Sequence, residues 1–248
     1  IFMIIVITLL VGYYFGPYTN VELTIQPRNH NFSIANQTNN MQFYSNMRFP
    51  KKEITYRIDD NCILSKKQEM RDAFELLKNL TTLNFIPINS NEEIIITCEE
   101  TNRYEEGMFI AGEGGPSKIV KAGNYNVILG GTILLIRNSN CERPNIAIHE
   151  LLHVLGFTHS NNPDNIMYNF SKCSQVIGED TISLIDEIYS QESLPNLVLE
   201  NASANLKNRY LNLNISIRNN GLVQSQDSEL FIKINNKTIK SFNIRELG

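Results

Sequence analysis

The chain has 248 residues, of which 42% are hydrophobic, and a formal net charge of −4. This length exceeds that of one ordinary domain, and the apolar content is sufficient for a packed core. With a pI near 5.7 and no lysine- or arginine-rich block, a nucleic-acid partner has no electrostatic support, so none is expected.

The chain begins with an uncharged apolar run, IFMIIVITLLVGYYFG, over residues 1–16. This run is shorter than the roughly 20 residues of a membrane-spanning helix and is typical of a signal peptide. Because the first residue is not Met, a longer membrane anchor stays open, and a buried core helix is a third alternative. Export predicts an extracellular or cell-surface protein, with membrane attachment through this segment if it is retained. The polar, asparagine-rich residues 17–46 lack periodicity and predict a linker.

Strand-like and helix-like patterns alternate over residues 47–192. EITYRI (53–58) alternates as a strand does, and residues 65–80 repeat apolar side chains at helical spacing. Ser65 and Gln68 form a capping-box pattern at the start of that helix. Further strands are expected at 83–88, 92–98, 117–121, 125–129 and 132–137, the last three separated by glycine-rich turns.

Two more helices complete this region. Pro144 is suited to the first position of a helix, and Gly156 is suited to its end. Residues 180–190 carry isoleucines at helical spacing and predict the last helix. The order of elements predicts an α/β (α+β) domain over 47–192.

The pattern changes after Pro195. RYLNLNISI (209–217) alternates with period two, and Asn235–Asn236 marks a hairpin turn between two further strands. Residues 195–248 therefore predict an incomplete β-sandwich resembling an immunoglobulin domain, since about 100 residues make a full one.

Four cysteines, Cys62, Cys98, Cys141 and Cys173, occur without a CxxC motif. In an exported chain an even number favours two disulfides, with three pairings open, and four buried free thiols are the alternative. Seven glycosylation sequons occur, at Asn31, Asn36, Asn79, Asn169, Asn201, Asn214 and Asn236. They matter only where the host glycosylates.

Three of the four histidines lie within HELLHVLGFTH, residues 149–159. His149 and His153 are four residues apart, so a helix places both on one face, where they can bind one metal ion. Gly156 lets the chain turn so that His159 becomes a third ligand, and the fourth position of a catalytic zinc stays open. The alternative is a pair of core or surface histidines, but chance agreement with the whole pattern is on the order of 10⁻⁵.

HELLHVLGFTH, followed by SNNPDNIMY, resembles the metzincin clan of zinc endopeptidases and most closely its matrixin (matrix metalloproteinase) family. The resemblance extends from MRFPKKEITYRI through EEIIIT to GEDTISLIDEIYS and covers roughly residues 47–190. It implies a twisted mixed sheet of about five strands with an active-site helix and a C-terminal helix. It also implies a protein or peptide substrate.

The resemblance assigns roles to individual residues. His149, His153 and His159 correspond to the zinc ligands, and Glu150 to the general base acting on a zinc-activated water. Met167 corresponds to the hydrophobic floor below the zinc. The alternative, an ordinary core methionine, is physically almost the same assignment. Astacin-like metzincins place a zinc-binding tyrosine two residues after that methionine, where this chain has Asn169, so Tyr168 is interpreted as packing.

The chain also departs from the matrixin pattern. His30, the only other histidine, lies in the predicted linker, so we expect one catalytic zinc and no structural zinc. No aspartate-rich loop indicates calcium, and the cysteine-switch motif of matrixin prodomains is missing. In this fold, strand ends would bring Cys62 near Cys98, and Cys141 with Cys173 would flank the active-site helix and the methionine turn. These two pairings are therefore expected.

Two functions follow as hypotheses. The first is a secreted or membrane-tethered zinc endopeptidase, which binds an extended peptide beside an edge strand within the glycine-rich residues 112–129. An ordinary surface hairpin is the alternative for those residues. The second function is a non-catalytic cell-surface binding protein that uses the C-terminal β-rich segment. The sequence indicates neither the cleavage specificity nor the oligomeric state.

Overall fold

The computed structural model describes residues 22–25, 41–101, 103–105, 108–136, 141–207, 210–234 and 236–248. The apolar segment 1–16, His30 and the sequons Asn31 and Asn36 lie outside these ranges. Within them, none of the helices combines the length and the apolar character that crossing a membrane requires.

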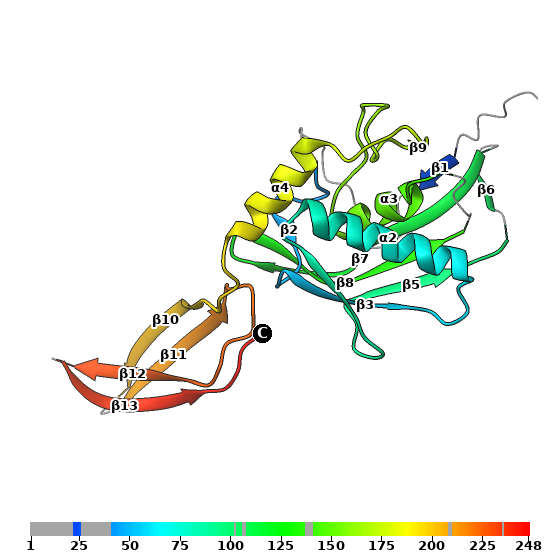
Figure 1. Cartoon of the computed structure of the whole chain (residues 1–248). Coiled ribbons are helices and arrows are strands. Elements are labelled where there is room, and N and C mark those ends of the chain that lie inside the picture. The colour runs from blue at the N-terminus through cyan, green and yellow to red at the C-terminus, as the bar shows by residue number, and fades with distance from the viewer. Residues whose placement is uncertain are drawn as a thin grey trace, which may run out of the picture.

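A mixed β-sheet forms the centre of the larger domain (Figure 1). Its five principal strands follow the order β4-β3-β5-β8-β7, in which β7 is antiparallel to β8 and the other pairs are parallel. These strands are β3 (Glu53–Ile58), β4 (Asn84–Pro87), β5 (Ile94–Cys98), β7 (Met108–Ala122) and β8 (Tyr125–Leu135). The predicted mixed sheet of about five strands is confirmed. Four short strands join it, namely β1 (Glu22–Ile25), β2 (Met47–Arg48), β6 (Arg103–Glu105) and β9 (Phe170–Ser171).

In the described part of the chain three helices accompany the sheet: α2 (Leu64–Leu80), α3 (Asn145–Val154) and α4 (Glu179–Ser190). Their apolar faces share one core with the inner faces of the strands, as the predicted helical spacing requires. The prediction of a capping box is wrong, because the N-cap residue of α2 is Ile63, which makes no side-chain capping hydrogen bond. Gln68 instead donates a hydrogen bond to Asp72 one turn later, at 2.8 Å.

The β7–β8 hairpin differs from the prediction. The sequence pattern predicts three short strands, but residues 125–135 form one continuous strand through Gly130 and Gly131. Neither glycine forms a turn, and Gly131 is needed for the packing of α3 on the sheet. A Cβ on Gly131 would lie 2.4 Å from a side-chain carbon of Val154, so its absence allows α3 to approach the sheet.

Parts of the predicted linker 17–46 belong to the domain. β1 pairs with β7 and β9, and the backbone N–H of Phe43 donates to the carbonyl of Gly156 at 2.9 Å. Backbone pairing of an extended segment needs no apolar periodicity, so composition could not indicate it. Next along the chain, the buried guanidinium of Arg48 donates to the carbonyls of Ile188 and Gln191 and fastens β2 to the end of α4.

The C-terminal segment consists of two antiparallel hairpins. One joins β10 (Leu197–Lys207) to β11 (Tyr210–Asn219), and the other joins β12 (Ser228–Ile234) to β13 (Lys237–Ile244). Asn236 has a φ of 61°, as expected for a tight hairpin turn. The hairpins extend away from the mixed sheet (Figure 1). They form separate two-stranded sheets, so the likeness to an immunoglobulin sandwich stays a prediction.

Both expected disulfides are present, and they use all four cysteines. Cys62 joins Cys98 between the start of α2 and the end of β5. Cys141 joins Cys173, which links the segment before α3 to the segment after β9. The predicted pairings are confirmed.

Candidate metal centre

The helix α3 lies closely against β7. All ten of its residues are buried, including His149, Glu150 and His153. Glycine makes this approach feasible, since a Cβ on Gly114 would lie 2.3 Å from the backbone oxygen of Glu150. Pro144, expected as the first helical residue, is the N-cap, one position earlier.

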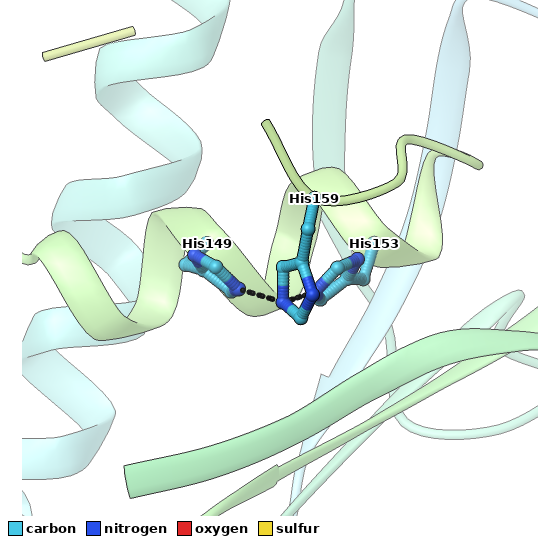
Figure 2. A group of neighbouring side chains, drawn as sticks. All are labelled: His149, His153 and His159. Atoms are coloured by element: carbon cyan, nitrogen blue, oxygen red, sulfur yellow. Dashed lines mark hydrogen bonds between the residues drawn. The ribbon is translucent and has the colours of Figure 1, made fainter. Parts of the chain in front are cut away.

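The chain turns at Gly156, whose φ of +94° is a conformation that L side chains rarely adopt. A side chain here would also collide with Met47, at 2.7 Å from its Cβ. The turn brings His159 back over the helix, so that three imidazoles face one another (Figure 2).

The imidazole nitrogens have the spacing of metal ligands. The Nε2 atom of His159 lies 3.2 Å from the Nε2 atoms of both His149 and His153. Ligand nitrogens at about 2.0–2.1 Å from a tetrahedral zinc are roughly 3.3 Å apart. The three side chains are therefore positioned to bind one metal ion, and in the described part of the chain no other such group occurs.

Backbone carbonyls orient two of the rings. The Nδ1 atom of His149 lies 2.6 Å from the carbonyl oxygen of Ile166, and that of His153 lies 2.8 Å from the carbonyl oxygen of Phe157. An Nδ1–H that donates to a carbonyl leaves Nε2 as the metal-facing lone pair. Phe43 also stacks on His153, with ring centroids 5.8 Å apart.

The rings are held neutral, as metal ligands must be. Burial, followed by the neighbouring His159, lowers the pKa of His149 to about 3. Burial, followed by the other two rings, lowers the pKa of His153 well below its usual value. Burial also lowers the pKa of His159 to about 4.

The carboxylate of Glu150 is fully buried, and both of its oxygens lack a hydrogen-bond partner among the described residues. Burial, followed by Glu113, raises its pKa well above the usual value. Buried carboxylate oxygens without partners are unusual, and a dication with water beside the three histidines would both satisfy and ionise them. The residues therefore fit a zinc ion.

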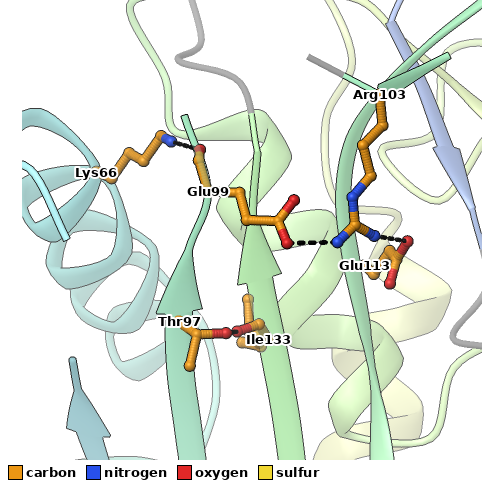
Figure 3. A network of polar contacts seen from close by, with 6 residues as sticks. All are labelled: Lys66, Thr97, Glu99, Arg103, Glu113 and Ile133. Atoms are coloured by element: carbon orange, nitrogen blue, oxygen red, sulfur yellow. Dashed lines mark hydrogen bonds and ion pairs between the residues drawn. The ribbon is translucent and has the colours of Figure 1, made fainter. Parts of the chain in front are cut away.

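Arg103 of β6 connects the end of β5 to β7 through a charged network (Figure 3). Arg103 donates to Glu113 at 3.1 Å and also to Glu99. Two carboxylates thus share one guanidinium, and one of them, Glu113, contributes to the raised pKa of Glu150.

Residues 160–178, here called the Met-turn loop, connect His159 to α4. Met167 is buried in the core and lines one cavity together with His159. Its role as the floor below the zinc stays a prediction. Tyr168 is half-buried and packs near Phe170, with ring centroids 5.9 Å apart. The packing interpretation of Tyr168 agrees with this contact.

The model of the Astacin peptidase family matches residues 41–166, which are half of the chain. The chain belongs to the astacin family. The match begins at the segment that packs on His153 and ends one residue before Met167. Metzincins of this family use a catalytic zinc, in agreement with the three histidines that this astacin-family chain brings together.

Two curated relatives were found as well. Interstitial collagenase of Oryctolagus cuniculus is 27% identical over 166 residues, which are 60% of this chain and 34% of the relative. Macrophage metalloelastase of Rattus norvegicus is 26% identical over 175 residues, which are 63% of this chain and 35% of the relative. The chain spans about a third of the length of these relatives.

The predicted metzincin is thus confirmed, whereas its narrower assignment to the matrixins is not supported by the family match. The narrower assignment relies on the short distance from His159 to Met167. That distance is the length of a loop, and loops vary among relatives more readily than ligand spacing does.

Some residues of the site have no signal in the sequence. The carbonyls of Ile166 and Phe157 orient ligands through the backbone, so their residue types carry no information. Gly114 belongs to the glycine-rich stretch 112–129, but its contact with Glu150 is evident only from the fold.

Proposed function

We propose that this astacin-family chain is a zinc-dependent endopeptidase that hydrolyses peptide bonds in proteins or peptides. One observation carries the proposal: the buried, unpartnered carboxylate of Glu150 stands beside three converging imidazoles. A structural metal site would need no such carboxylate, because its ligands would already be complete.

His149, His153 and His159 would hold the zinc ion. A zinc ion there supplies Lewis acidity, which polarises a carbonyl group and makes water more acidic. The carboxylate of Glu150 accepts a proton from the attacking water and then donates it to the leaving amine. The buried walls around Glu150 keep bulk water from competing for that proton.

An extended peptide has a place to bind on the outer edge of β7. In the structure β1 occupies that edge, pairing with β7 on one side and β9 on the other. The same backbone groups can pair with an extended substrate that takes the place of β1. This supports β7 as the substrate edge, around Ile110 and Glu113, which overlaps the predicted residues 112–129 only at their start.

The disulfides support an extracellular or cell-surface location for this peptidase. Both bonds join segments distant in sequence, by 36 and 32 residues, and such structural disulfides persist in oxidising compartments. Whether the segment 1–16 is a signal peptide or an anchor is a separate prediction, which N-terminal sequencing of the mature protein tests.

The test is cleavage of a quenched peptide library by the zinc-loaded chain, before and after a chelator and again after zinc is restored. Chelation should abolish cleavage and zinc should restore it. Glu150→Gln should lower kcat by about 10²–10⁴-fold, since general acid–base catalysis contributes that much. Its zinc affinity should stay unchanged, because Glu150 is not a ligand.

The control is Glu142→Gln, which removes an exposed carboxylate just before α3 and should keep full activity. A wild-type chain that binds one zinc and cleaves nothing in a broad library would contradict the proposal. That result would favour the alternative, a non-catalytic cell-surface binding protein.

A further inference from the structure

The Met-turn loop is irregular apart from the two residues of β9, yet it carries a group that the metal centre needs. The carbonyl of Ile166 is the acceptor for Nδ1 of His149, at 2.6 Å. The orientation of His149 therefore depends on the position of a loop. His153 differs, because its acceptor, Phe157, is only four residues away at the end of its own helix.

A buried glutamine closes the Met-turn loop. The side chain of Gln175 is 1% exposed, and its Nε2 donates to the carbonyls of Pro163 and Phe170 at 3.0 and 2.8 Å. Its Oε1 accepts from the backbone N–H of Lys172 at 2.8 Å. Pro163 and Phe170 stand on either side of Ile166, so one carboxamide fixes both ends of the segment that bears the acceptor carbonyl.

A buried asparagine ties this loop to α3. Asn145 is the first residue of the helix, is 2% exposed, and lies one turn before His149. Its Nδ2 donates to the carbonyl of Lys172 at 2.8 Å, and the disulfide between Cys141 and Cys173 makes a covalent link beside it. The helix and the loop are thus fastened at one point by an amide and a disulfide.

We propose that Gln175 and Asn145 are positioning residues of the metal centre, which hold the Ile166 carbonyl where it orients His149. The inference rests on the proposed role of His149 as a zinc ligand. The two amides bond to backbone groups and fix the conformation of the loop. They affect the metal centre only indirectly, through the carbonyl that orients His149. Loss of a partner that orients a metal-binding histidine typically costs 10–100-fold in metal affinity or activity.

The C-terminal segment offers a matched control. Asn219 is also a buried amide, and its Nδ2 donates to the carbonyls of Val223 and Leu247 at 2.8 and 2.9 Å. Its Oδ1 accepts from the backbone N–H groups of Asn196 and Gly221. It closes a loop much as Gln175 does, but in a different part of the fold.

The experiment compares the full chain with Gln175→Met and Asn219→Leu, which keep the side-chain volume and remove the hydrogen bonds. Zinc affinity is measured by competition with a chromophoric chelator. The visible absorption of the Co²⁺-loaded chain reports the number and geometry of the ligands. Circular dichroism and chemical unfolding confirm that each variant is folded.

Gln175→Met should lower zinc affinity by about 10–100-fold and shift the Co²⁺ absorption toward that of His149→Ala. Asn219→Leu should lose stability but leave both metal readouts at the wild-type values. If Gln175→Met does not fold, Asn145→Ala decides by the same readouts, since alanine is well tolerated in a helix.

A folded variant whose zinc affinity falls by less than about fivefold, with an unchanged Co²⁺ spectrum, overturns the proposal. An equal loss of affinity in Asn219→Leu also overturns it, because the effect would then follow global stability. Both readouts concern metal binding. A wild-type chain that cleaves no peptide would thus contradict the proposed function without altering this test.

Discussion

The helix α3 and the Met-turn loop both build the metal centre, but they hold it by different means. α3 is regular and buried along its whole length, and it packs on β7 where glycines leave room. The loop has almost no regular structure, and the buried amides of Gln175 and Asn145 hold it together with one disulfide. The helix sets the spacing of two of the histidines that are positioned to bind a metal ion, and the loop supplies the carbonyl that orients one of them.

This difference predicts which property a substitution in each region should change. Changes in how α3 packs should lower the stability of the whole domain, because its side chains are part of the common core. Changes in what holds the loop should act on metal binding beyond their effect on stability. The first of the following predictions separates these two outcomes directly, and the others test single parts of the comparison.

The largest expected effect on stability comes from the disulfides. Replacing either pair of cysteines by serine should cost about 3–4 kcal/mol, since both bonds close loops of similar length. Only loss of Cys141–Cys173 should weaken zinc binding, because only that bond holds the Met-turn loop. Urea unfolding and zinc competition on both double variants measure this, and equal loss of zinc affinity in both would break the comparison.

Zinc itself should stabilise the fold. At a free zinc concentration of 100 times Kd, the gain in unfolding free energy should be about 2.7 kcal/mol, because the unfolded chain lacks the assembled site. His153→Ala removes a helical ligand and should abolish this gain, as thermal unfolding with and without zinc would reveal. A gain that persists in His153→Ala would place the zinc elsewhere.

A smaller effect is expected from the close contact between α3 and β7. Gly114→Ala should cost about 1–3 kcal/mol, since its Cβ would meet backbone atoms of Glu150, which cannot move aside. Gly130→Ala is the control, because its Cβ would meet the mobile hydroxyl of Ser117. Chemical unfolding of both variants gives the difference, and equal costs would show that the approach of the helix does not depend on Gly114.

The smallest effect concerns β1, which touches both regions through β7 and β9. Leu23→Pro removes a backbone donor from this strand and should weaken its pairing. KM for a peptide substrate should then fall by a few-fold, with kcat nearly unchanged, because the substrate no longer displaces β1. An unchanged KM in steady-state assays would mean that substrate binds away from this edge.

The sequence predicts well those elements whose local residue spacing matches the periodicity of a helix or a strand. The four-residue spacing of His149 and His153 places both on one face of a helix, and α3 has that face. The turn at Gly156 brings His159 back toward them. The alternation in EITYRI likewise describes a strand with one inner face, and β3 has those bounds.

The elements that the sequence does not predict depend on neighbours distant in sequence. The pair Gly130–Gly131 predicts a break between strands, but the strand continues through it. The residue that requires the small size of Gly131 is Val154, which lies in α3 and is distant in sequence. Nothing in the local sequence distinguishes the buried Gln175 from the exposed polar residues around it. Its partners are backbone groups of the loop, whose positions the residue types do not reveal.

Zinc X-ray absorption spectroscopy of the zinc-loaded chain tests the central claim most directly. We predict one zinc per chain with three imidazole nitrogens at about 2.0–2.1 Å and no sulfur ligand. The His159→Ala variant should show one imidazole fewer. A zinc with fewer than three imidazoles in the wild-type chain, or with a sulfur ligand, would contradict the account.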